Sequence, residues 1–167
     1  QNGGYAVILI DGTLELRRSG ESFFDSVQRF SLKIPGQPTC LLQLTENRFL
    51  VGTDRGQLLS CDVNSESSPM EWAPPSGGWK PVALAHRSSN SQVLLVDQRH
   101  GQIWELDSEK GNPLQSWTGF IDPTDVTEAG NSIYVTDRGW QRLIPCVDGE
   151  KSGRFEAALG DHGAPPG

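Results

Sequence analysis

The sequence predicts an all-β protein, a β-propeller with four-stranded blades of about 42 residues, and three observations lead to this prediction. Three segments that begin at Pro38, Pro81 and Pro123 align with one another, and Pro165 follows at the same interval. Each segment holds short runs of apolar and β-branched residues separated by polar turns, which is typical of strands. No stretch between the segments shows sustained helical spacing. Short strands that recur at this period are the signature of propeller blades.

Each predicted unit repeats the same order of elements. A strand follows the proline, and a polar turn leads to a second strand that ends in an aspartate, at Asp54, Asp97 or Asp137. A turn with basic residues leads to a third strand, and a looser fourth segment closes the unit, as at residues 114–118 and 154–159. Such a sheet has two apolar faces, which neighbouring blades can cover. A β-sandwich is the alternative all-β fold, but a sandwich has no reason to repeat its sequence.

The prolines also set the expected boundaries of a single propeller region. Residues 5–16 match the second and third strands of a unit, with Asp11-Gly12 as a tight hairpin turn, so the first unit is partial. An open ring would expose apolar sheet faces, so we expect part of a larger ring of about six blades; a closed ring of four blades is the alternative. The expected units are a partial blade at 1–37, blades near 38–80, 81–122 and 123–164, and the start of a further blade at 165–167.

The composition narrows the class of protein. The chain has 167 residues, 35% of them apolar, and a net charge of −7, which favours one folded domain over disorder. No run of about 18 apolar residues is present, so no membrane span is expected. Cys40, Cys61 and Cys146 cannot all pair with one another, and each lies in an apolar segment. This pattern predicts reduced, mostly buried thiols in a cytoplasmic protein, with a disulfide scaffold as the less favoured alternative.

Two further features bear on packing. Residues 64–78 contain four serines, three prolines and two glycines, which predicts a flexible spacer, with an adaptable binding loop as the alternative. Trp72, Trp104 and Trp117 are expected to pack between blades rather than to contact a ligand.

The third unit carries a resemblance to a known repeat. It reads Pro123-Thr-Asp-Val-Thr, then Gly130-Asn-Ser-Ile-Tyr-Val-Thr-Asp137, then Gln141-Arg-Leu-Ile. This resembles the NHL repeat, whose members typically read P-x-G-V-x-V, G-x-I-Y-V-A-D and N-x-R-I. The unit departs from that pattern at Asp125, Trp140 and Leu143, and the first two units keep only the order of strand, aspartate, turn and strand.

The NHL resemblance implies a propeller that recognises other macromolecules. Propellers of this family occur at the C-terminus of tripartite-motif (TRIM) ubiquitin ligases, where they select substrates or bind RNA, and in bacterial sensor proteins and a secreted amidating lyase. The unpaired thiols and the lack of a secretory signal favour the intracellular ligase relatives. The chain holds no RING or B-box array of cysteines and histidines, so ligase chemistry would lie in other domains of the parent protein.

The two kinds of turn in a blade open at opposite ends of the sheet, and charge divides between them. The turn between the second and third strands and the connection between blades carry basic and aromatic residues that we predict to bind a partner: Arg55, Trp79, Lys80, Arg99, His100, Arg138, Trp140 and Arg142. The other end carries mainly carboxylates: Glu46, Asp107, Glu109, Glu128, Asp148 and Glu150, with Lys110 and Lys151. Arginine and tryptophan dominate binding hot spots and also suit phosphates and unpaired bases. The alternative is that each arginine pairs with a nearby aspartate and only solvates a turn.

No residue is predicted to be catalytic, to bind a metal or to hold a cofactor. The aspartates recur once per unit, which is typical of carboxylates that cap a turn. His86, His100 and His162 show no metal-ligand spacing, and the thiols lie in predicted strands. The sequence also lacks a Gly-x-Ser-x-Gly elbow, a phosphate-binding glycine loop and a dinucleotide motif. We therefore expect a module that is not an enzyme.

The leading hypothesis is a module that recruits a protein substrate or adaptor, as substrate recognition for an intracellular ubiquitin ligase. The alternative is binding of single-stranded RNA through the basic and aromatic residues, which would depend steeply on salt. A metal-assisted propeller enzyme is disfavoured because the repeats supply no cluster of carboxylates or histidines. No membrane and no small-molecule cofactor is predicted as a partner.

Overall fold

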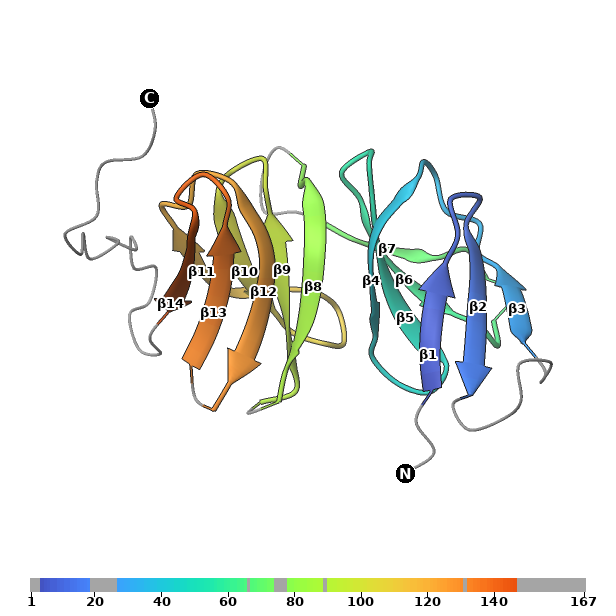
Figure 1. The fold of residues 1–167 in the computed structure, drawn as a ribbon. Coiled ribbons are helices and arrows are strands. Elements are labelled where there is room, and N and C mark those ends of the chain that lie inside the picture. The colour runs from blue at the N-terminus through green and yellow to red at the C-terminus, as the bar shows by residue number, and fades with distance from the viewer. Residues whose placement is uncertain are drawn as a thin grey trace.

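The computed structural model describes residues 4–18, 27–65, 67–73, 78–88, 90–130 and 132–146. Within these residues the chain has fourteen strands in four antiparallel sheets and no helix (Figure 1), so the all-β prediction is confirmed. We call the sheets blades A to D. Blade A contains β1 (Gly4–Ile8), β2 (Thr13–Arg18) and β3 (Gln28–Ser31), and blade B contains β4 (Pro38–Gln43), β5 (Arg48–Thr53), β6 (Leu58–Asp62) and β7 (Met70–Trp72). Blade C contains β8 (Pro81–Arg87), β9 (Gln92–Asp97), β10 (Gln102–Leu106) and β11 (Pro113–Thr118), and blade D contains β12 (Pro123–Ala129), β13 (Ser132–Asp137) and β14 (Arg142–Cys146).

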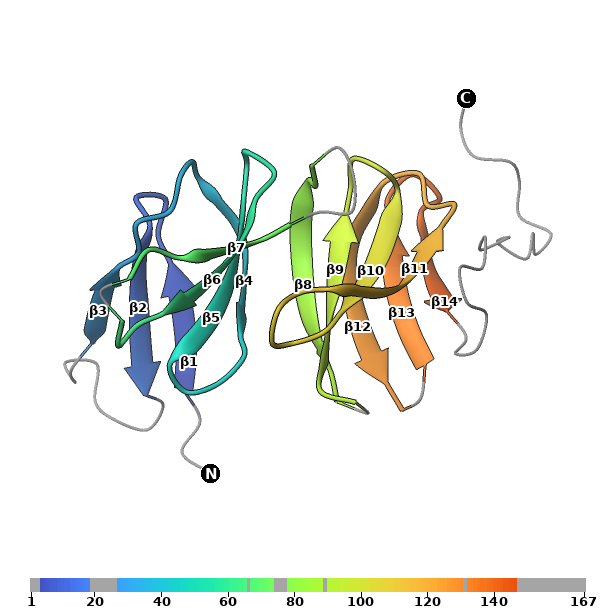
Figure 2. The same cartoon turned by 180° about the vertical axis from the view of Figure 1, so that it is seen from behind.

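Each blade is a meander in which strands that follow one another in sequence pair side by side. Figures 1 and 2 show the blades standing next to one another in the order A, B, C, D. Neighbouring blades contact through β1 and β4, through β4 and β8, and through β8 and β12. The predicted hairpin in blade A is confirmed, because Ile8 pairs with Leu14 across a turn in which Gly12 has a φ of 82°.

The repeated proline has a structural counterpart in blades B, C and D. The pairing of the first strand with the second shifts register directly after the proline, between Pro38 and Cys40, between Pro81 and Ala83, and between Pro123 and Asp125. Proline has no N–H to donate to the ladder, so within sheets it is tolerated at the first residue of a strand and at bulges. The bulge at the same place in three blades explains why proline marks the period.

The hydrophobic core lies between the blades. Each of three clusters of buried side chains draws on two neighbouring sheets: Leu14, Phe49 and Cys61 between blades A and B, Trp72, Trp79 and Leu95 between B and C, and Val96, Trp117 and Val135 between C and D. Trp104 packs against the cluster between B and C. The prediction that Trp72, Trp104 and Trp117 pack between blades is therefore confirmed.

One segment differs from its prediction. Residues 64–78 are expected to be a spacer, but residues 70–72 form the outer strand of blade B, in which Met70 pairs with Ser60 and Trp72 with Leu58. The strand has three residues, and only Trp72 is buried. One buried side chain cannot form an alternating apolar and polar pattern, so the sequence gives no sign of this strand. The fourth strand expected at 154–159 and the further blade expected at 165–167 lie outside the described residues.

Candidate interaction surface

A buried aspartate ties the turn between the second and third strands of blade D to the segment that leads into the blade. Asp137 is 1% exposed, and its carboxylate accepts four backbone N–H groups. Two come from the incoming segment, Ile121 at 2.8 Å and Asp122 at 3.0 Å, and two come from its own turn, Gly139 at 2.9 Å and Trp140 at 3.2 Å. The predicted capping role is confirmed here.

The equivalent aspartates of blades B and C make fewer of these bonds. Asp97 is fully buried and accepts the N–H of Lys80 at 2.9 Å and that of Arg99 at 3.2 Å. Asp54 is exposed and accepts the N–H of Gln37 at 2.8 Å. All three carboxylates therefore join a turn to the incoming segment of the same blade, which places both at the same end of the sheet.

The turns of successive blades place the predicted basic residues at one end of the molecule. The turns at 53–57, 97–101 and 137–141 all open at the upper end in Figure 1. Backbone hydrogen bonds hold each turn against its incoming segment; for example, the N–H of Gln98 donates to the carbonyl of Lys80 at 3.1 Å. We call this end the basic face, defined by Arg55, Lys80, Arg99, His100, Arg138 and Arg142.

The basic side chains on this face are held to different degrees. The Nδ1 atom of His100 lies 2.6 Å from a carboxylate oxygen of Asp97, and the imidazole is 36% exposed. Arg138 pairs with Asp122 at 2.6 Å, but its side chain is 73% exposed, so solvent screens the pair and its contribution to stability is about 1 kcal/mol or less. Within the described part of the chain, Arg55 has neither an ion pair nor a side-chain hydrogen bond.

The two tryptophans predicted for this face are less accessible than expected. Trp79 is 1% exposed and packs in the core between blades B and C, so it is removed from the candidate surface. Its place in the connection between blades suggests exposure, but the Trp79 backbone lies against the turn of blade B: a Cβ added at Gly56 would lie 2.3 Å from the Trp79 carbonyl oxygen. Trp140 is half-buried against the core between C and D, and its indole N–H donates to the Gly119 carbonyl at 3.4 Å.

An exposed apolar residue adds to this face and is missing from the predicted set. Ile121 is 51% exposed and precedes blade D. A Cβ added at Gly139 would meet the Ile121 side chain at 2.4 Å, so Ile121 lies directly against the turn that carries Arg138 and Trp140. A single isoleucine in a connection gives no sequence signal, because its position relative to the turn depends on the capping by Asp137.

The opposite end carries carboxylates as predicted, but several of them serve the fold. The side chain of Glu128 is 7% exposed and lies 3.6 Å from Arg87, which also pairs with Glu105 at 2.6 Å. Asp107 accepts the N–H groups of its own turn, at residues 109, 110 and 112; these bonds outweigh the effect of burial and hold the pKa of Asp107 below its usual value. Asp148, Glu150 and Lys151 lie outside the described residues.

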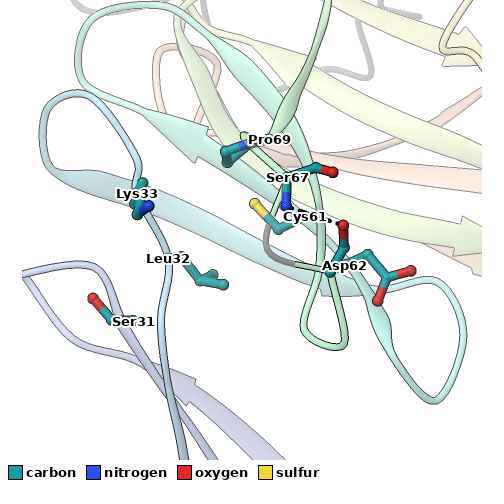
Figure 3. A pocket seen from close by; sticks show the side chains of 8 residues that line it. Ser31, Leu32, Lys33, Cys61, Asp62, Ser67 and Pro69 are labelled. Atoms are coloured by element: carbon teal, nitrogen blue, oxygen red, sulfur yellow. Dashed lines mark hydrogen bonds between the residues drawn. The ribbon is translucent and has the colours of Figure 1, made fainter.

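A small pocket lies between blades A and B. Its volume is about 360 Å³, and it is lined by residues 31–33 together with Cys61, Asp62, Ser65, Ser67 and Pro69 (Figure 3). Lys33 and Asp62 contribute opposite charges, and Ser31, Ser65 and Ser67 add hydroxyl groups. Burial raises the pKa of the Cys61 thiol to about 11, so the pocket contains no thiolate nucleophile near neutral pH.

None of the three cysteines is joined to another, and the prediction that most of them are buried is confirmed. Cys61 and Cys146 are buried and Cys40 is half-buried. Burial raises the pKa of Cys40 to about 11 and that of Cys146 to about 12. Among the described residues, no group of three or more His, Cys, Asp or Glu side chains is arranged to hold a metal ion, and no helix long and apolar enough to cross a membrane is found there.

Comparisons with known proteins identify the fold. The structure resembles the WD40 β-propeller domain of Doa1 with a TM-score of 0.62 and 15% sequence identity, over 80% of this chain and 43% of that chain. The chain has a β-propeller fold. It also resembles the computationally designed Ika8 protein, with a TM-score of 0.62 and 16% identity over 94% of this chain and 51% of that chain.

The propeller spans about half the length of these solved structures. At such low identity the likeness extends to the fold alone. No protein-family model and no curated protein matches the chain.

Proposed function

We propose that this propeller is a protein-recognition module that binds an acidic partner surface through the basic face. The observation that carries the proposal is the position of Ile121, which is 51% exposed and lies against the turn of Arg138 and Trp140. An apolar side chain surrounded by arginine and a partly exposed tryptophan has the composition of a protein-binding hot spot. The remaining basic residues would surround this centre as a polar rim.

The same observations favour protein over RNA as the partner. Binding of single-stranded RNA uses aromatic side chains on which bases stack. Trp79 is buried and Trp140 is half-buried against the core, so neither offers a free ring face of the kind expected from the sequence. The remaining cations would attract phosphates, but the apolar contribution of Ile121 suits a protein surface better.

A finer proposal concerns the parent protein. The third unit, from Pro123 to Ile144, resembles the NHL repeat, so we propose that the propeller recruits substrates for an intracellular ubiquitin ligase whose catalytic domains lie elsewhere in that protein. The basic face would then hold the substrate while those domains modify it.

The test compares the wild-type chain with three variants in affinity capture followed by quantitative mass spectrometry. Arg138→Glu/Arg142→Glu and Ile121→Ser should each lose the same set of proteins. Arg138 and Ile121 are largely exposed and Arg142 is half-buried, so the melting temperature of each variant is measured beside its binding. Lys110→Glu reverses an exposed charge at the opposite end and should retain that set. Retention of the same proteins by all four forms would refute the proposed surface.

A second measurement separates protein from RNA. The assay is fluorescence anisotropy of labelled single-stranded RNA of mixed sequence over a salt series. We expect that any RNA binding by the wild-type chain is also present in Arg138→Glu/Arg142→Glu, because the basic face does not bind RNA. RNA binding that falls steeply with salt and disappears in this variant would replace the protein proposal with the RNA alternative. Ligase context is tested separately, by whether the captured proteins are ubiquitinated by the parent protein.

A further inference from the structure

A groove crosses the seam between blades B and C at the end opposite the basic face. Its volume is about 630 Å³, which is within the range of peptide and ligand sites. Residues from three turns of two blades line it: Leu44, Thr45 and Arg48 of blade B, and His86, Arg87, Ser88, Ser91, Ser108 and Glu109 of blade C. No sequence repeat marks this site, because its residues differ from blade to blade.

The walls of the groove are already fixed by contacts between the blades. The guanidinium of Arg48 in blade B donates to the carbonyl of Glu109 in blade C at 2.5 Å. The Nε2 atom of His86 in blade C lies 2.8 Å from the carbonyl of Gln43 in blade B. Because these hydrogen bonds already order the walls, binding of a ligand loses less conformational entropy than it would at a flexible site.

The two arginines that line the groove are engaged with the protein. Arg48 donates to the Ser60 hydroxyl at 2.8 Å and stacks 5.9 Å from the centre of the Trp72 ring, in addition to its bond to Glu109. Arg87 is 5% exposed and lies between the carboxylates of Glu105 and Glu128. These cations therefore stabilise the walls. The charge of Arg87 is balanced by its two carboxylates, whereas Arg48 is held by neutral groups and keeps its positive charge.

The charge that remains around the groove is negative. The charged residues that surround the groove lie at this end of blades B and C and at Glu128 of the neighbouring blade D. The only cations among the described residues of this set are Arg48, Arg87 and Lys110. Six carboxylates lie there: Glu46, Asp62, Glu105, Asp107, Glu109 and Glu128. Glu109 lines the groove and is exposed, as is nearby Glu46, so both are available to a positively charged ligand.

We propose that this groove binds a basic peptide segment, an extended stretch of a partner protein that carries lysine or arginine. The aliphatic part of such a side chain would pack on Leu44, and its charged end would reach the Glu109 carboxylate. Hydroxyl groups of Ser88, Ser91 and Ser108 line the groove and can bond to the peptide backbone. This is a second surface, at the opposite end from the basic face, and it does not depend on the proposed function.

The test uses fluorescence anisotropy with two labelled peptides of about ten residues, one of alternating lysine and serine and one of alternating glutamate and serine. The chain should bind the lysine peptide and not the glutamate peptide. Glu109→Lys should weaken binding roughly tenfold, because one contact changes from attraction to repulsion. Glu71→Lys is the matched control, since Glu71 is also exposed but lies on outer strand β7, and it should bind within about twofold of wild type.

A steric variant distinguishes the groove from a general attraction to an acidic surface. Ser88→Trp places a large side chain at the exposed Ser88 that lines the groove, and it should abolish binding of the lysine peptide without removing any charge. Unchanged binding in Ser88→Trp, with the melting temperature of the wild type, would refute the groove as the site. Equal loss in Glu109→Lys and Glu71→Lys, or preferential binding of the glutamate peptide through Arg48, would overturn the proposal as well.

Discussion

The three capping aspartates should differ in their contribution to stability, even though they occupy the same position in the repeat. Asp137 accepts four backbone N–H groups and is 1% exposed. Asp137→Ala leaves these four donors without their acceptor. Each hydrogen bond to a charged group contributes roughly 1.5–3 kcal/mol, but part of the loss is recovered because water can reach donors near the surface. We therefore expect a loss of about 3–4 kcal/mol for Asp137→Ala.

Asp54→Ala is the matched comparison. Asp54 is exposed and accepts one backbone N–H, that of Gln37, so its loss should be about 1 kcal/mol or less. Asp97→Ala should fall between them, because Asp97 is buried but accepts two backbone N–H groups and contacts His100.

The free energy of unfolding from urea titration, with the slope checked for constancy, measures all three variants. Equal losses for Asp54→Ala and Asp137→Ala would refute the reasoning, since the repeat position rather than the number of bonds would then set the effect.

Three more predictions test packing, thiol burial and backbone strain. Gly111→Ala should lower the free energy of unfolding by at least about 2 kcal/mol more than Gly130→Ala in the same urea titration. Both glycines have a positive φ, so the backbone strain is similar in the two variants. A Cβ at Gly111 would lie 2.1 Å from Trp72 of the neighbouring blade, whereas nothing lies within 4 Å of a Cβ at Gly130. With Ellman's reagent at pH 8, the native chain should react slowly at Cys61, because a pKa of about 11 lowers the thiolate fraction of this residue to roughly a hundredth of that in the unfolded chain. The folded state holds the Cys61 proton more tightly than the unfolded state, so the free energy of unfolding should fall as pH rises from about 9 toward 11. Rapid reaction of all three native thiols would contradict their burial. Gln141→Gly should stabilise the chain by about 0.5–1 kcal/mol, since Gln141 has a φ of 52°, and a lower melting temperature would argue against strain at this turn.

The fold could be predicted from the sequence because its determinants recur with the period. Pro38, Pro81 and Pro123 occupy the same bulge, and Asp97 and Asp137 cap the same turn, so each position is visible several times in one chain. The strand β7 was missed for the opposite reason. Its only buried residue is Trp72, which packs against another blade, and one residue cannot establish a pattern.

The candidate surface was predicted only in part, because exposure depends on contacts that are distant in sequence. The rule that turns alternate between the ends of a sheet correctly placed the segments that carry Arg55, Arg99 and Arg138 at one end. It could not show that Trp79 turns inward between blades B and C, nor that Ile121 lies against the turn of blade D. Both outcomes depend on how the connection between two blades is folded, which local sequence does not encode.

The departures from the repeat therefore indicate function better than the repeat itself does. A residue that recurs in every blade, such as the capping aspartate, meets a requirement common to all blades, namely the joining of a turn to its incoming segment. Arg48, Ile121 and Glu109 do not recur in every blade. Ile121 and Glu109 are exposed, and Arg48 holds the wall of a groove. Partner specificity has to come from positions that the fold leaves free to vary. The seam between blades B and C and the turn of blade D, where such residues gather, are for this reason the places at which substitutions should change binding without changing the propeller.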